Sequence, residues 1–202
     1  MRRAPLVVSA LLIAACHAPA PAPRLTPPPP PLPAPQEAFW RSLSALCGQA
    51  FGGGVVNSNA TDSLLVRSAL RIHVRQCTDS EIRIPFHVGA NRSRTWVLTR
   101  TADGLRLSHD VRMPSGREER IAGYGGGSRG AGSAERQYFS ADTASVRIMP
   151  STRGTLWTLE LVSGQQLAYE VRKEGTDRYL RIEFDVAHPM AQLPPAPWGA
   201  ER

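Results

Sequence analysis

The pattern of hydrophobic positions changes its period once along the chain. Between Pro35 and Phe51, apolar residues recur at helical spacing, and three glycines follow at 52–54. Proline suits a first helical turn and a run of glycines ends a helix, so we expect one helix over residues 35–51. From Leu70 onward, apolar and polar residues alternate, which is typical of strands with one buried face.

The alternating segments predict a mainly β domain. We expect strands over residues 70–75, 81–88, 95–100, 105–113, 120–124, 145–149, 155–162, 167–172 and 178–186. Asp103-Gly104 lies between two such runs and predicts a tight hairpin, while Pro85 indicates an edge position or a bulge. About eight or nine strands at even spacing predict an antiparallel meander. We expect a small up-and-down barrel rather than a sandwich, and its architecture resembles lipocalins and other calycins without their signature motif.

Proline and glycine divide the chain into segments. Eleven of the 18 prolines precede residue 37, four follow residue 188, and glycine is absent before residue 37. We therefore expect the folded domain at residues 37–188 and a proline-rich tail at 189–202. Residues 16–36 favour extended polyproline II structure and predict a stiff tether.

The N-terminus has the features of an export signal. Arg2 and Arg3 precede a short apolar stretch, which predicts a signal peptide over residues 1–15. Its end, Ile13-Ala14-Ala15-Cys16, resembles the lipobox of bacterial lipoproteins, which implies lipidation of Cys16. His17, a residue other than Asp, resembles the outer-membrane sorting pattern. The expected location is the outer membrane facing the periplasm, with the membrane as partner through the lipid. An ordinary cleaved signal peptide and an uncleaved anchor are the alternatives.

Two cysteines remain for the folded domain, Cys47 and Cys77. Disulfides persist in exported proteins, so we expect these two residues to pair. Two buried thiols are the alternative.

One strand points a histidine toward the expected barrel interior. His109 shares its side of the strand with Leu105, Leu107 and Val111, and aromatic residues occur on several other strands. The candidate ligand-binding residues are His109, Trp96, Trp157, Tyr169 and Phe86. A satisfied core histidine and ordinary core packing are the alternatives for this set.

The sequence contains no pattern that is typical of a metal or redox site. It has no HExxH or CxxC spacing, and we expect no catalytic residue, no metal and no cofactor, and a protein that is not an enzyme. Gly125 to Gly130 match the dinucleotide fingerprint by letter, but no helical pattern follows. We expect a mobile loop over residues 123–132 instead.

The net charge of +7 comes almost wholly from arginine, since 23 of the 24 basic residues are Arg. The excess is spread along the chain without interleaved aromatics, so nucleic acid is not an expected partner. The favoured function is binding of an apolar or amphipathic small molecule in the barrel. A second hypothesis is an envelope module that contacts an anionic surface or a partner protein through Arg71, Arg75, Arg83, Arg106 and Arg112. A third is a hydrolase that uses His109.

The domain also resembles a poorly characterised family of exported proteins from Gram-negative bacteria. The resemblance rests on Ala50-Phe51-Gly52, residues 107–112, Tyr124-Gly125-Gly126, residues 139–142 and Glu183-Phe184-Asp185. In that family the strand that contains His109 is richer in histidine, whereas this chain has Val111 and Met113 at those places. The resemblance therefore implies no activity, and no metal or acid–base role for this strand.

Overall fold

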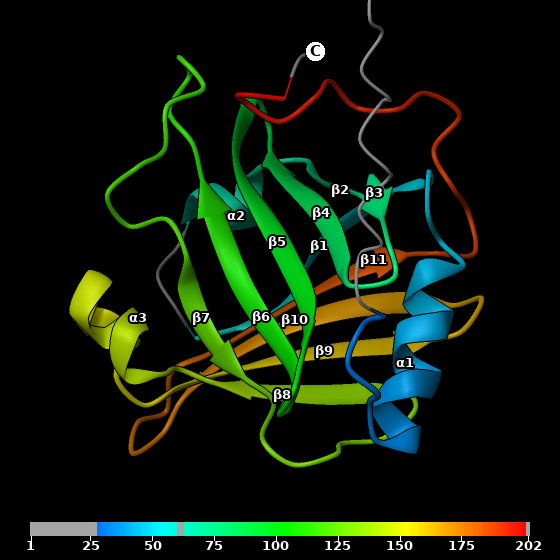
Figure 1. Cartoon of the computed structure of the whole chain (residues 1–202). Coiled ribbons are helices and arrows are strands. Elements are labelled where there is room, and N and C mark those ends of the chain that lie inside the picture. Colours follow the sequence, from blue (N-terminus) through cyan, green and yellow to red (C-terminus); the bar gives the residue numbers. More distant parts are fainter. Residues whose placement is uncertain (1–27, 60–62, 201–202) are drawn as a thin grey trace, which may run out of the picture.

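The fold was analysed in a computed structural model, which describes residues 28–59 and 63–200 (Figure 1). In chain order the elements are α1 (Ala34–Ser44), β1 (Ala50–Ser58), α2 (Ser63–Arg67), β2 (Leu70–His73), β3 (Gln76–Cys77), β4 (Glu81–Val88), β5 (Asn91–Thr101), β6 (Gly104–Val111), β7 (Tyr124–Gly127), β8 (Arg136–Ser140), α3 (Thr143–Ile148), a 3-10 turn at Pro150–Thr152, β9 (Thr155–Val162), β10 (Gln166–Lys173) and β11 (Tyr179–Asp185). The expected signal peptide, the lipobox at Cys16 and most of the expected tether lie outside the described residues.

The strands form one antiparallel sheet that curls into a nearly closed barrel. Its order is β7-β6-β5-β4-β2-β1-β11-β10-β9-β8, and the short β3 pairs with β4. Apart from β3, strands that are adjacent in the sheet are consecutive in sequence, with one exception: the first strand, β1, pairs with the last, β11. This confirms the predicted meander and barrel, although the described residues form eleven strands where eight or nine were expected.

The barrel closes where β7 meets β8. Ser128 and Phe139 form a β-bridge, and the amide of Arg129 donates to the carbonyl of Tyr138 at 2.7 Å. The Ser145 hydroxyl lies 2.6 Å from both the amide nitrogen and the carbonyl oxygen of Gly125. This seam corrects two predictions, because the expected mobile loop contains β7 and the expected strand at 145–149 is mostly helix α3.

Glycine makes this close approach of backbones practicable. Gly125 and Gly126 are buried, and a Cβ added to Gly126 would collide with the carbonyl group of Ser140. Neither residue has a positive φ, so the requirement is for space rather than for an unusual conformation. The glycine run is therefore a packed strand.

The first helix is shorter than the prediction. It ends at Ser44, and residues 50–58, including the glycines expected to stop the helix, form β1. Gly53 pairs with Phe184 of β11, and a Cβ at Gly53 would collide with the Phe184 ring. Hydrophobic spacing could not separate the helix from the strand, because Ala50 and Phe51 continue the helical period by coincidence.

Of the other local predictions, one is wrong and one is confirmed. Residues 120–122 form a turn, and the strand expected over 120–124 begins only at Tyr124. The predicted hairpin at Asp103-Gly104 is confirmed, with Thr101 paired to Gly104, which has φ 116°.

Pro85 lies in β4 between the part that pairs with β2 and the part that pairs with β3. No strand needs its missing N–H at that point.

Helix α1 closes one end of the barrel (Figure 1). Phe39, Trp40 and Leu43 are buried in the main core, because they recur on one side of the helix. Arg100 on β5 forms a two-bonded ion pair with Glu37, at 2.6 and 2.9 Å, and its guanidinium stacks 4.6 Å from the Trp40 ring centre. The helix is thus fastened to the strand ends that it covers.

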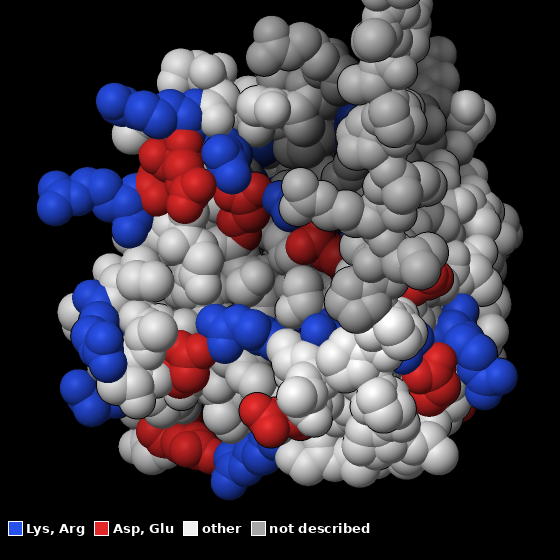
Figure 2. Space-filling model, in the orientation of Figure 1, with Lys and Arg blue, Asp and Glu red and all other residues white. Residues whose placement is uncertain are grey.

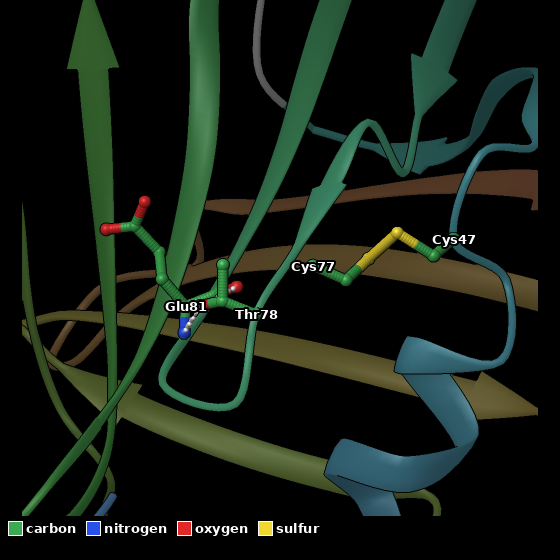
Figure 3. Close-up of a disulfide and its surroundings, with 4 residues drawn as sticks. All are labelled: Cys47, Cys77, Thr78 and Glu81. Carbon is green, nitrogen blue, oxygen red and sulfur yellow. Dashed lines mark hydrogen bonds between the residues drawn. A yellow bond between two sulfur atoms is a disulfide. The ribbon is translucent and has the colours of Figure 1, made fainter. Parts of the chain in front are cut away.

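A disulfide between Cys47 and Cys77 confirms the predicted pairing. It joins the segment after α1 to β3, across 30 residues of sequence (Figure 3). Next to it, Thr78 accepts a hydrogen bond from the amide of Glu81 at 2.9 Å and begins the turn into β4. The disulfide therefore holds the C-terminal end of α1 to the wall of the barrel.

The proline-rich tail lies along the outside of the barrel (Figure 1). The Arg92 guanidinium donates to the Ala196 carbonyl at 2.7 Å, and Arg75 donates to the carbonyl of Ala200 at 3.1 Å. Pro197 is buried and Trp198 is half-buried, so residues up to 200 belong to the packed structure.

Candidate functional site

A cavity of about 260 Å³ opens at the end of the barrel opposite α1. It is surrounded by the β4–β5 hairpin, the β10–β11 turn, helix α2 and the 3-10 turn. The five predicted ligand-binding residues, His109, Trp96, Trp157, Tyr169 and Phe86, all line it. They come from five different strands, and only the curvature of the sheet brings them together.

Three of the aromatic residues form a stack along one wall. The Trp96 ring lies 5.1 Å from Phe86 and 4.4 Å from Tyr169, measured between ring centres, and is nearly parallel to both. Both faces of Trp96 are therefore covered by protein, and its side chain is only 1% exposed. Such a stack makes a rigid apolar wall with little rotamer freedom left to lose on binding.

His109 lies at the floor of the cavity, 1% exposed, and both of its ring nitrogens have partners. Nδ1 is 3.1 Å from the Tyr124 carbonyl, which can only accept, so Nδ1 carries the proton. Nε2 then accepts a hydrogen bond from the Tyr169 hydroxyl at 2.9 Å. The ring also stacks on Tyr124, with centres 4.3 Å apart. His109 thus fixes two tyrosines of the cavity lining.

Burial lowers the pKa of His109 to about 4, with Arg94 acting in the same direction and the Tyr124 carbonyl opposing it. Burial also lowers the pKa of His87 to about 4 and, by a smaller shift, that of His73. These side chains are neutral at neutral pH. A neutral His109 is required here, because protonated Nε2 could not accept from Tyr169.

These shifts predict a loss of stability in mild acid. An unfolded histidine takes up its proton near pH 6.5 and folded His109 only near pH 4, so stability falls as the pH drops between these values. For one such group, linkage gives a loss of about 2 kcal/mol between pH 7 and pH 5. Urea unfolding at several pH values measures it. His109→Gln should flatten the profile by about that amount, and exposed His188→Gln should not; equal slopes for all three proteins would contradict the prediction.

The mouth of the cavity differs chemically from its floor. Three cationic side chains, Arg94, Lys173 and Arg178, line it together with Leu64 and Leu65 of α2. Leu64 is 63% exposed although it faces the cavity, so apolar surface remains uncovered at the mouth. The described lining contains no Asp or Glu.

The sequence analysis missed Arg94 as a site residue, although a signal for it existed. Arg94 lies two residues before Trp96 on β5, so the period of two places both on the interior face. Arginine was interpreted throughout as surface charge, because an interior arginine is rare unless it has a partner.

The described cavity lining supplies apolar, hydroxyl-bearing and cationic side chains. No carboxylate contacts His109 among the residues that the structure describes, and within those residues no three His, Cys, Asp or Glu side chains gather in a way that could hold a metal. The lining combines an aromatic wall and a cationic rim with five hydroxyl-bearing residues, Tyr124, Ser151, Thr152, Thr155 and Tyr169.

Comparison with protein-family models, with curated proteins and with solved structures gives no match to this chain.

Proposed function

We propose that this protein binds a small apolar or amphipathic molecule in its barrel cavity. The observation that carries the proposal is the open cavity itself, which is lined by aromatic side chains from separate strands. A barrel of about eight strands is just wide enough to be filled by side chains or to hold one small ligand, and the diameter grows with the number of strands. A space that the aromatic residues leave open, next to uncovered leucines, is typical of a ligand site.

The volume sets the size of the ligand. One water molecule occupies about 30 Å³ of the liquid, so 260 Å³ corresponds to the volume of about nine waters or of a small organic ligand, with more room outside the mouth. Burying an apolar ligand of that size against rigid rings is favourable without ordering the protein first.

The cellular setting that we propose for this binding is the periplasm, with the protein held at the outer membrane by a lipid on Cys16. The sequence pattern around Ile13–Cys16 supports it. Within the described residues, no helix is long and apolar enough to cross a membrane. Palmitate labelling of the wild-type chain and of Cys16→Ala tests the anchor separately from the binding site.

The binding proposal is tested by native mass spectrometry of the exported full chain, followed by organic extraction and identification of any released mass. Val171 lines the cavity, so Val171→Phe should fill part of it and reduce the bound fraction at least fivefold. Val56→Phe, at a position that is 55% exposed on β1, is the matched control and should keep the ligand. An empty wild-type protein that also fails to bind added 1-octanol would refute the proposal.

The alternative of an arginine-rich docking face receives less support from the structure. Arg83 and Arg112 both pair with Asp110 at 2.7 Å, and Arg106 pairs with Asp142. Figure 2 shows basic and acidic side chains intermixed over the face that includes these strands. Neutralised arginines attract an anionic partner only weakly.

The hydrolase alternative would need a base that is available to substrate. His109 uses both ring nitrogens on Tyr124 and Tyr169, and its lowered pKa makes it a weak base at neutral pH. Normal turnover of a substrate panel by His109→Gln would argue against this alternative as well.

A further inference from the structure

Among the residues that the structure describes, no Asp or Glu lines the cavity beside its cationic rim. Lys173 donates to the Ser151 carbonyl at 3.2 Å, which orients its ammonium group without neutralising it. Arg178, like Lys173 and Arg94, lines the cavity, and no described Asp or Glu shares the lining. Elsewhere on the barrel, arginines such as Arg83, Arg106 and Arg181 do pair with carboxylates. Within the described lining, the positive charge at the mouth of the cavity therefore has no carboxylate beside it.

Arg94 reaches deepest of the three. It is half-buried on β5, where it pairs with Phe86 of β4 and Val111 of β6. Trp96 of the aromatic wall follows two residues later on the same face of the strand, so Arg94 lies next to that wall on the side of the mouth. Its positive charge opposes the rise that burial causes in the pKa of Tyr124, another residue of the cavity lining. A guanidinium has five N–H donors in a planar fork, which suits it to bind a carboxylate or a phosphate.

The charge of Arg94 acts on the whole floor of the cavity. It lowers the pKa of His109 and opposes the rise that burial causes in the pKa of Tyr124 and Tyr169. A positive charge that is felt by three buried groups lies in a region of weak solvent screening. An anion placed there would form a strong, charge-assisted hydrogen bond.

We propose that the ligand carries an anionic headgroup, a carboxylate or a phosphate, which is held by Arg94 with Lys173 and Arg178 at the mouth, while its apolar part lies against the Phe86–Trp96–Tyr169 stack. This inference rests on the proposed binding function and names its ligand class. A short-chain amphipathic acid matches the volume, the apolar wall and the sign of the charge together.

The test compares ligands that share one apolar chain. Octanoate, octyl phosphate, 1-octanol and octylammonium are titrated into the full chain, and tryptophan fluorescence reports on Trp96 and Trp157, which line the cavity. The protein carries Cys16→Ser, so that no lipid is attached and no detergent competes. We expect octanoate or octyl phosphate to bind at least tenfold more tightly than 1-octanol, with octylammonium weakest. Which anion binds more tightly distinguishes a carboxylate from a phosphate ligand.

The matched variants locate the effect. Arg94→Met should remove at least tenfold of the anion affinity and leave 1-octanol binding within twofold. Arg172→Met is the control. Arg172 precedes Lys173 in sequence, but its side chain is 60% exposed and stacks on Tyr179 outside the cavity, so its loss should change neither affinity. Equal binding of octanoate and 1-octanol, or equal losses in both arginine variants, would overturn the inference while the binding function stood. Failure of every octyl ligand to bind would refute the binding function itself.

Discussion

Replacing Gly126 with alanine is expected to destabilise the barrel by more than about 3 kcal/mol, at the upper end of overpacking effects. The added methyl group would overlap the backbone carbonyl of Ser140, which no rotamer change can move aside. To make room, β7 would have to separate from the end of β8, and the hydrogen bonds of the seam would be lost. Urea denaturation monitored by circular dichroism measures the change.

Gly127→Ala is the matched control for this substitution. Gly127 is the next residue of the same strand, is exposed, has no positive φ, and has no atom within 4 Å of an added Cβ. We expect its stability to remain within about 0.5 kcal/mol of the wild type. If Gly126→Ala were as mild as Gly127→Ala, the glycine run would be a loop and the seam would not be closed as described.

Removal of the disulfide by the double substitution Cys47→Ser and Cys77→Ser is expected to cost about 3–4 kcal/mol, from the loop entropy of 30 residues. The physical reason is that the link restricts the unfolded chain, and it also holds α1 over the barrel end. The midpoint of urea unfolding, with its slope, measures the loss.

Reduction of the wild-type protein provides the control for this pair. Wild type with dithiothreitol should unfold at the midpoint of the double variant, and the double variant should not respond to dithiothreitol. A loss below about 1 kcal/mol in both cases would show that packing of α1, rather than the link, secures that end of the barrel.

Several features of this protein followed from the sequence alone. Alternation of apolar and polar residues defined most strands, and short turns such as Asp103-Gly104 made neighbours in sequence neighbours in the sheet. That combination is sufficient for an antiparallel meander. The cysteine pairing followed from chemistry and number, since two residues allow one intramolecular bond.

Local patterns failed where spatial neighbours overrode them. The segments at 50–58 and 124–127 are rich in glycine, which has low strand propensity, yet both are strands. In each, glycine is required by a partner distant in sequence, Phe184 for Gly53 and Ser140 for Gly126. Conversely, the alternating residues at 145–148 became a short helix, which begins at Asp142, whose side chain accepts from the amide of Ser145.

The candidate site, too, could be predicted from the sequence only in part. The sequence determined which side chains face the interior, because the period of two is a local property of each strand. Only the tertiary structure decided that His109, Trp96 and Tyr169 contact one another, that space remains beside them, and that Arg94 lacks a described carboxylate in the cavity lining. These properties depend on how the sheet curves and closes. Each strand contributes a small twist, and the curvature results from all of them together, so no single segment of the sequence determines it.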